Sequence, residues 1–227
     1  MPAGRLSEDG RHASGAIVGE WCRNSLVGLR TWAPVRREPA PVTAVVLVEG
    51  LSDAAALRVL AARSRRDLAA EGVEIVSMGG GTNIGHYLRV LGPTGRGITV
   101  AGLCDAGEEQ FFRRAMNHHG FLATTRDEMA GHGFFVCDSD LEDELLRALG
   151  VDAVERVLQR EGELELFRRF QQQPAQRQRP THDQMHRFAG VRSGRKVRLA
   201  ASMAEALDLE DVPRPLHDLL EFVWPVG

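Results

Sequence analysis

The chain has 227 residues, of which 26% are charged and 43% hydrophobic, and its formal net charge is −3 at pH 7. This composition is typical of a folded globular protein and excludes collagen, a coiled coil and a wholly disordered chain. The longest apolar run, Ala44 to Val48, is far shorter than the roughly 18 residues of a membrane-spanning helix, and the N-terminus lacks the layout of a signal peptide, so we expect a cytoplasmic protein.

Cysteine and lysine are both scarce. The three cysteines, Cys22, Cys104 and Cys137, form no CxxC pair, so neither a disulfide framework nor a cysteine zinc site is indicated. We expect them to be buried apolar thiols. Of the 28 basic residues, only Lys196 is Lys. A single lysine in a chain that otherwise uses Arg is a candidate for a chemical role.

Residues 1–42 are predicted to form an N-terminal extension and linker. They contain Gly, Arg and Pro without sustained periodicity, which is typical of loops. Trp21, Leu26, Leu29 and Trp32 have the spacing to dock one short helix on the rest of the protein. We expect little chemistry from this segment.

Residues 43–150 alternate between short apolar strands and helical patterns. The strands are rich in β-branched or aromatic residues and are predicted at 43–48, 73–77, 98–103 and 133–137. The helices are predicted between them, one capped by Ser52 and the others at 83–91, 108–118 and 141–149. This alternation predicts an α/β fold with a doubly wound parallel sheet of about four strands, covered on both faces.

Residues 151–227 show helical patterns only, and we predict a helical C-terminal subdomain that carries Lys196. The helices are expected at 151–170, 182–188, 197–207 and 215–223. The polar segment 171–180, rich in Gln and Arg, is either a flexible connection or a loop ordered by a ligand.

Charge is distributed unevenly along the chain. Residues 103–145 contain ten acidic residues and three Arg, a balance of −7, whereas residues 156–198 contain eleven basic and four acidic residues, a balance of +7. Carboxylates that hold divalent metal beside Arg side chains that bind a polyanion would have this distribution, because phosphate contacts dominate nucleic-acid affinity. Two solvated helix faces would have it as well.

Acidic residues follow three of the predicted strands. Glu49 follows the first strand, with Asp53 one helical turn on; Asp105 follows the third, and Asp140 and Glu142 follow the fourth. Ligands of open parallel sheets bind beyond the carboxyl ends of the strands. A single acid there is usually a helix cap, but several like charges at one edge repel each other unless hard cations such as Mg²⁺ lie between them.

The second strand is followed by a glycine turn, Gly79–Asn83. This turn does not match GxGxxG, because Ile84 stands where the last Gly would be, and the chain has no GxxxxGK[ST] motif. Dinucleotide binding and a P-loop NTPase are therefore disfavoured. We expect a tight strand-to-helix turn capped by Thr82 or Asn83 rather than a phosphate cradle.

His182 and His186 are four residues apart on a predicted helix and could hold a metal from one face. The intervening Asp183 and Gln184 do not reproduce HExxH, and the sequence offers no evident third ligand. We therefore interpret the pair as surface histidines near a basic face.

The segment Val48–Asp53, which reads VEGLSD, resembles the VEGxSD opening of a TOPRIM domain. TOPRIM domains are the catalytic module shared by type IA and type II topoisomerases, bacterial primases and the overcoming-lysogenization-defect (OLD) nucleases. The later landmarks resemble the OLD branch and come in its order, over roughly residues 43–223. These landmarks are the turn Gly79–Asn83, Asp105, the Asp138–Glu142 element, Lys196 and Val212-Pro213.

The resemblance implies a Mg²⁺- or Mn²⁺-dependent DNA endonuclease that uses two ions. It implies a set of acidic metal ligands, of which Glu49 also serves as general acid/base: Glu49, Asp53, Asp105, Glu109, Asp140 and Glu142. Lys196 falls where the OLD nucleases place a catalytic Lys, a compact ammonium beside a transferring phosphoryl group. The chain departs from the family at the DxD motif, which reads Asp105-Ala106-Gly107, so that Glu108 or Glu109 has to replace the second Asp.

The resemblance also implies partners. Nucleic acid, in the first place DNA, is the expected substrate, and five Arg side chains are candidates for contacts with its backbone: Arg168, Arg169, Arg177, Arg179 and Arg192. OLD proteins carry an ATPase domain before their TOPRIM region, whereas about 42 residues precede it here, so we expect the chain to act alone or with a separately encoded ATPase. A homo-oligomer is compatible with the sequence, and no membrane partner is expected.

Two other functions stay open at this point. One is a non-catalytic TOPRIM-like module that binds nucleic acid or a partner ATPase, with Gly107 marking lost chemistry. The other is a nucleotidyl transferase or hydrolase that acts on small phosphoesters. A topoisomerase is excluded, because it needs a nucleophilic Tyr and the single Tyr87 lies on a predicted helix within the fold.

Overall fold

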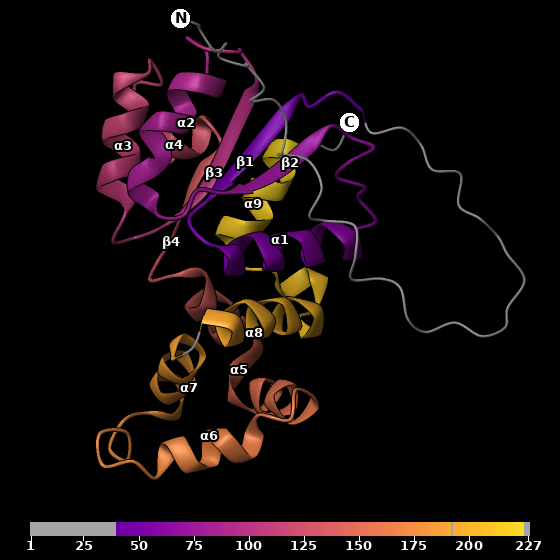
Figure 1. Ribbon diagram of the computed structural model, residues 1–227, viewed down its shortest axis with the longest axis vertical. Coiled ribbons are helices and arrows are strands. Elements are labelled where there is room, and N and C mark those ends of the chain that lie inside the picture. The colour runs from indigo at the N-terminus through magenta and orange to yellow at the C-terminus, as the bar shows by residue number, and fades with distance from the viewer. Residues whose placement is uncertain (1–39, 192, 225–227) are drawn as a thin grey trace, which may run out of the picture. The chain divides into compact units, whose positions relative to one another are not determined.

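The computed structural model describes residues 40–191 and 193–224. Its sheet has four parallel strands in the order β2-β1-β3-β4 (Figure 1). The strands are β1 (Ala44–Val48), β2 (Val73–Ser77), β3 (Thr99–Asp105) and β4 (Phe134–Cys137). The four predicted strands are confirmed to within two residues at each end, and so is the doubly wound α/β fold.

Helices cover both faces of the sheet, which is why β1 is buried along its whole length. Val46 and Val48 belong to one core cluster, and Val45 and Leu47, which point to the opposite face, belong to another. Two helices cover the first face, α1 (Leu51–Arg63) and α9 (Arg214–Val223), and three cover the second, α2 (Ile84–Leu91), α3 (Glu109–His118) and α4 (Arg126–Gly131) (Figure 1).

The N-cap residue of α1 is Gly50 and not Ser52, so the predicted cap is wrong. Gly50 is extended, and its backbone N–H donates to Asp53 Oδ2 at 2.7 Å. The acid one turn into the helix therefore satisfies a donor that would otherwise have no partner at the helix start. Ser52 is buried inside the first turn.

Helix α4 was not predicted from the sequence. It has six residues, and Met129 is its one buried side chain, so its apolar periodicity is too short to recognise. The helix is instead defined by a capping box, in which Glu128 N–H donates to Thr125 Oγ1 at 3.2 Å and Thr125 N–H donates to Glu128 Oε2 at 3.1 Å.

The described residues after β4 form helices, as expected, but with different boundaries. Helix α5 continues through the expected break near residue 150, with a kink where Gly150 adopts φ +72°, a conformation that favours glycine. The single helix expected at 151–170 is divided between α5 and α6. The helices are α5 (Leu141–Arg160), α6 (Leu164–Gln171), α7 (Thr181–Gly190) and α8 (Ser193–Ala206). Within residues 40–191 and 193–224, no helix is long and apolar enough to cross a membrane.

The polar segment 171–180 is tied to α7 by one buried side chain. Gln184 Nε2 donates to the carbonyls of Gln176 and Arg179, at 2.8 and 3.0 Å, and Gln184 Oε1 accepts from Gln171 Nε2 at 2.6 Å. These hydrogen bonds satisfy a buried amide and hold the segment against the protein.

Helix α8 packs against α1 and α5, and its apolar face belongs to the same core cluster as α1. Leu57 and Leu60 of α1 are fully buried, as is Ala200 of α8. Arg63 Nη1 closes the contact by donating to the carbonyls of Ala204 and Leu207. This packing places Lys196, on α8, near the start of α1. The division of the chain at residues 42 and 150 stays a prediction.

Cys104 and Cys137 are free and buried, as expected, and burial raises the pKa of both thiols. Cys22 lies outside the described residues, and so does the short helix expected around Trp21 and Trp32.

Candidate active site

The carboxyl ends of β1, β3 and β4 lie side by side, because these three strands are neighbours in the sheet. Glu49 follows β1, and Asp105 is the last residue of β3. Asp53 lies in the first turn of α1, and Asp140 and Glu142 lie at the start of α5, after β4. The structure therefore brings these five carboxylates to one edge, which we call the acidic edge.

Burial raises the pKa of four of these acids, and repulsion among them adds to it. Burial is the largest cause at Glu49, Asp53 and Glu142. The effect is strongest at Asp105, where burial, followed by the charges of Glu49, Asp53 and Asp140, raises the pKa to about 8. The five carboxylates thus lie within electrostatic reach of one another.

Several oxygens near the acidic edge are buried and, within the described part of the chain, accept no hydrogen bond: Oε2 of Glu49 and Glu108 and Oε1 of Glu142. An unsatisfied buried acceptor of this kind costs about 1–3 kcal/mol. Carboxylate oxygens are the ligands that Mg²⁺ and Mn²⁺ prefer, so the donor chemistry fits a divalent cation.

The potential ligand side chains lie farther apart than they would around a bound metal ion. Among residues 40–191 and 193–224, no three acidic, His or Cys side chains are close enough together to hold one ion. Carboxylates at the acidic edge would therefore have to change rotamer to share an ion.

Lys196 reaches the acidic edge from α8. Its Nζ lies 3.1 Å from Glu142 Oε2, and the Glu142 side chain is only 2% exposed. Burial lowers the pKa of Lys196, but Glu142, Asp53 and Asp140 together raise it above its ordinary value. Lys196 in turn lowers the pKa of Glu49, Asp53 and Asp105 against their burial. The single lysine of the chain is therefore a positive charge among the carboxylates.

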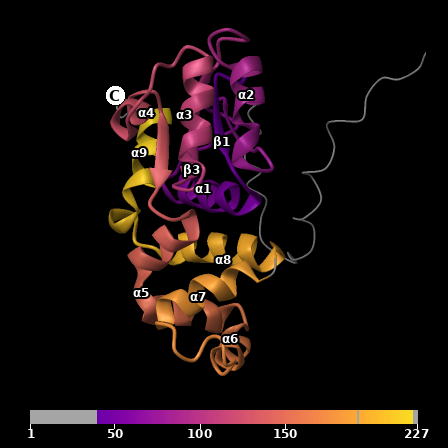
Figure 2. The same ribbon diagram turned by 90° about the vertical axis from the view of Figure 1, so that its left-hand side faces the viewer.

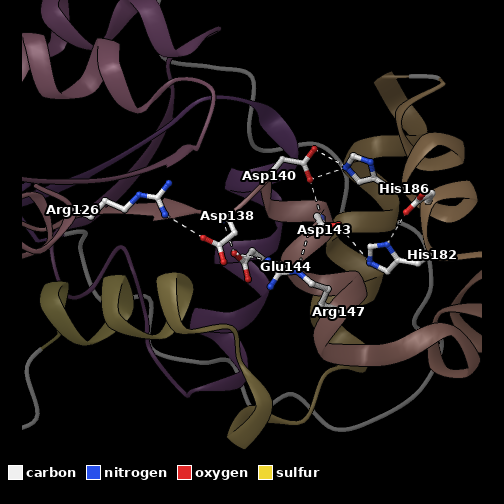
Figure 3. Close-up of polar contacts among 9 residues, drawn as sticks. Arg126, Asp138, Asp140, Asp143, Glu144, Arg147, His182 and His186 are labelled. Atoms are coloured by element: carbon white, nitrogen blue, oxygen red, sulfur yellow. Dashed lines mark hydrogen bonds and ion pairs between the residues drawn. The ribbon is translucent and has the colours of Figure 1, made fainter. Parts of the chain in front are cut away.

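Asp140 is the N-cap of α5 and contacts a histidine of α7 (Figure 3). Its Oδ1 accepts Asp143 N–H at 2.9 Å, and His186 Nε2 lies 2.9 Å from Oδ1 and 2.7 Å from Oδ2. Burial raises the pKa of Asp140, but the hydrogen bonds from His186 and Asp143 outweigh it and hold the pKa below its usual value.

The interpretation of His182 and His186 as surface histidines near a basic face is wrong. His182 Nε2 lies 3.5 Å from Asp143 Oδ1, so both histidines face the acidic first turn of α5. The sequence did contain a signal for this contact, which is the matched spacing of the two pairs. Asp140 and Asp143 are three residues apart at the start of one helix, and the histidines are four residues apart on another, so each pair lies on one helix face.

Glu108 and Glu109 point to different surroundings. Glu109 pairs with Arg113 at 3.1 Å and with Arg126 at 2.8 Å. Glu108 instead lies against Gly81, where a Cβ would come within 2.8 Å of Glu108 Oε2, and its charge helps to raise the pKa of Glu49. Glu108, which was not chosen over Glu109 from the sequence, is therefore the one nearer to the acidic edge.

The glycine turn after β2 borders the same region. Gly80 N–H donates to the Glu49 carbonyl at 3.1 Å, and Asn83 Nδ2 donates back to the Met78 carbonyl at 2.8 Å. Asn83 is the N-cap residue of α2, one of the two expected positions, but its side chain braces the turn and makes no cap hydrogen bond to the helix.

The candidate nucleic-acid-binding arginines of the described residues lie on α6 and the loop after it. In both views this part of the chain is far from the sheet, and α7 and α8 lie between the two (Figure 2). Arg168 pairs with Glu155 at 2.6 Å. Arg169, Arg177 and Arg179 donate to nearby carbonyls, and all four side chains are exposed. Arg192 lies outside the described residues.

A chain of polar contacts runs from the acidic edge along α5 (Figure 3). Arg147 bridges Asp143 and Glu144, at 2.8 and 2.9 Å, and Glu144 Oε1 accepts Asp138 N–H at 2.9 Å. Arg126 joins Asp138 at 3.2 Å. Arg126, Asp138, Glu144 and Arg147 border a pocket of about 720 Å³ between α4, α5 and α9, which is lined by four acidic and three basic side chains.

Comparison with known proteins finds a family model that matches the first part of this region. Residues 42–106 match the family described as "Overcoming lysogenization defect protein-like, TOPRIM domain". The matched segment contains Glu49, Asp53 and Asp105. No curated protein matches the sequence.

The solved structures extend the likeness to most of the chain. The C-terminal region of the Burkholderia pseudomallei OLD protein superposes with a TM-score of 0.63 at 20% identity, covering 80% of this chain and 97% of that one. The C-terminal region of the Xanthomonas campestris pv. campestris OLD protein gives 0.60 at 24% identity, covering 80% and 92%. Residues 42–106 are thus similar to an OLD-like TOPRIM domain, and the chain has the fold of the C-terminal region of OLD proteins.

Proposed function

We propose that this protein is a Mg²⁺- or Mn²⁺-dependent nuclease that cleaves phosphodiester bonds of nucleic acid, in the first place as a DNA endonuclease. The observation that carries the proposal is the convergence of Glu49, Asp53, Asp105 and Glu142, all buried or half-buried, around Lys196 at the carboxyl edge of a parallel sheet. The match to the OLD-like TOPRIM domain supports a nuclease-related function.

The residues proposed to hold divalent cation are the acids of the acidic edge: Glu49, Asp53, Asp105, Asp140 and Glu142. The resemblance also implies Glu109, but Glu108 has the better position, because Glu109 is already paired with two arginines. We propose two ions, as the family resemblance implies. When bound, divalent cations supply Lewis-acid stabilisation of the charge on a transferring phosphate.

The chain's own residues have distinct roles in this proposal. Glu49 has a buried Oε2 without a hydrogen-bond donor in the described part of the chain, so this oxygen can accept a proton from the attacking water. Lys196, 39% exposed at its side chain, can turn from Glu142 toward a phosphate and offset its developing negative charge. The arginines of α6 and the following loop would contact more distant phosphates and position the strand.

A cleavage assay tests the proposal. The protein is incubated with supercoiled plasmid and with single-stranded DNA, under Mg²⁺, Mn²⁺ or EDTA. We expect metal-dependent nicking that falls about 100-fold or more in Glu49→Ala and Lys196→Ala, the scale of losing one charged group at a transition state. Glu74→Ala and Arg156→Ala, which remove exposed charges on β2 and α5, serve as matched controls and should retain activity.

Other outcomes favour other functions. Full activity in both Glu49→Ala and Lys196→Ala would contradict the assignment of the site. DNA binding with one weak metal and no cleavage would favour a non-catalytic module, and turnover of nucleotides but not polymers would favour a transferase or hydrolase of small phosphoesters.

A further inference from the structure

Asp140 is an acid of the acidic edge whose two oxygens both have hydrogen-bond donors, and one of these donors lies on a helix far away in the sequence. Oδ1 accepts the Asp143 N–H that starts α5, and His186 Nε2 lies within hydrogen-bond distance of both oxygens. By contrast, Glu142 has only the Lys196 ammonium, 3.1 Å from its Oε2, and its Oε1 has no hydrogen-bond donor within the described residues. The Asp140 carboxylate is therefore fixed in orientation, while its neighbour is held only by the ion pair with Lys196.

His186 reaches Asp140 from a helix that is distant in sequence. The two residues are 46 apart, and α7 packs against α5 so that the imidazole lies over the first turn of α5 (Figure 3). Both side chains are only partly exposed, 33% for His186 and 21% for Asp140. The hydrogen bond is thus partly shielded from competition by water.

The same two helices are also joined by a second pair, His182 and Asp143, which does not involve Asp140. His182, one turn before His186, lies 3.5 Å from Asp143 Oδ1 without a hydrogen bond at Nε2 among the described residues. Asp143 is held by Arg147 at 2.8 Å instead. The two histidines therefore share a helix and a partner helix, and they differ in whether they contact the acidic edge.

Asp140 belongs to the acidic edge electrostatically. Its charge contributes to the pKa of Glu49, Asp53, Asp105 and Glu142. The orientation of its carboxylate therefore affects where negative charge is concentrated at this edge. Hydrogen bonds from outside a metal's ligand set orient the ligands, and their loss typically costs 10–100-fold in metal affinity.

We propose that His186 is a positioning residue, whose Nε2–H holds the Asp140 carboxylate in the orientation in which it binds a divalent cation. The inference rests on the proposed function, in which Asp140 is a metal ligand. It assigns to α7 a specific contribution to the site, beside that of Lys196 on α8.

The test measures Mn²⁺ affinity of the full chain by electron paramagnetic resonance of free Mn²⁺, without DNA. We expect His186→Ala to weaken Mn²⁺ binding by about 10–100-fold. His186→Gln should recover most of the affinity, because its Nε2 amide can donate from a similar position. His182→Ala, the matched control, removes the neighbouring contact of the same helix and should bind Mn²⁺ like the natural chain.

A second arm separates positioning from general destabilisation. In an Asp140→Asn background, His186→Ala should cause little further loss of Mn²⁺ affinity, because the carboxylate that His186 positions is already gone. If His186→Ala lowers the melting temperature, this arm stays informative, because the Mn²⁺ affinity of His186→Gln can be compared in the natural chain and in the Asp140→Asn background.

Three results would overturn the inference. They are unchanged Mn²⁺ affinity in His186→Ala, an equal loss in His182→Ala, or a full additional loss in the Asp140→Asn background. If the natural chain itself binds no Mn²⁺, the proposed function is overturned and this inference with it. If the natural chain binds Mn²⁺ and His186→Ala binds it equally well, only the positioning role fails.

Discussion

Single residues at the acidic edge have structural as well as chemical roles. Asp53 accepts a hydrogen bond from the backbone N–H of Gly50 at the start of α1, and Asp140 accepts one from the backbone N–H of Asp143 at the start of α5. An acid at a strand end is usually a helix cap, and here the cap and the candidate ligand are the same residue. Substitutions must therefore be chosen to separate the two roles.

Asp140 can be tested in this way, because Asn caps helices as well as Asp does. Asp140→Ala should lower the free energy of unfolding by about 1 kcal/mol through loss of the cap. Asp140→Asn should be less destabilising, while weakening Mn²⁺ binding as much as the Ala variant does. Urea unfolding and Mn²⁺ titration measure the two effects. Equal destabilisation by both variants would show that the charge, and not the cap, stabilises the fold.

Gly107 stands where the TOPRIM DxD motif has its second Asp, and the structure leaves room for that side chain. A Cβ at this position would meet nothing within 4 Å. We expect Gly107→Asp to strengthen Mn²⁺ binding, by about tenfold, because more carboxylate ligands raise cation affinity. Gly131→Asp, at a similarly open position on α4, is the control for added charge. An equal gain in both variants would indicate a non-specific charge effect.

Among the elements, the contact between α1 and α8 determines where Lys196 lies. Leu57 and Leu60 of α1 are fully buried in the cluster that includes α8. Arg63 adds hydrogen bonds to the last carbonyls of α8, where a cation is favourable. The position of the lysine is thus decided by apolar packing some turns away from the chemistry.

Leu60→Ala should lower the free energy of unfolding by about 2–5 kcal/mol, because it leaves a cavity under α8. Leu51→Ala, on the same helix with a side chain that is 66% exposed, should change it by less than about 0.5 kcal/mol. Urea denaturation of both variants checks this. Similar values for the two would mean that α8 is not packed on α1 in solution.

For the whole molecule, the clustered acids predict how stability depends on pH. The folded chain raises the pKa of Asp105 from 3.8 to about 8, mainly through burial. Between these values the folded state binds more protons than the unfolded state, so the contribution of this group makes stability fall as pH rises. Glu49, Asp53 and Glu142 contribute in the same direction, and Asp140 in the opposite one.

In EDTA, the melting temperature should therefore fall between about pH 5 and pH 8. Asp105→Asn, which cannot ionise, should flatten this decrease and be the more stable chain at pH 8. Thermal melts across this range provide the measurement. A decrease of the same slope in both chains would assign the effect to other groups.

Much of the fold follows from local patterns in the sequence. Apolar runs with β-branched or aromatic residues indicate the strands, because the strands of a parallel sheet covered on both faces are largely buried. The acids after β1, β3 and β4 meet at one edge because parallel strands end together. The resemblance of residues 48–53 to the TOPRIM opening agrees with the family match over residues 42–106.

Tertiary structure decided what depends on helix-to-helix packing. The matched spacing of the histidines and the acids was not enough to place His186 on Asp140, because nothing local to α7 indicates that this helix packs against the first turn of α5. It could not distinguish Glu108 from Glu109, because a helix turns adjacent residues in different directions and only the start of α3 decides which faces Glu49. The sequence alone thus determined the residues at the strand ends, whose place follows from chain direction. The partners brought by α3, α7 and α8 were decided by contacts between segments far apart in the chain.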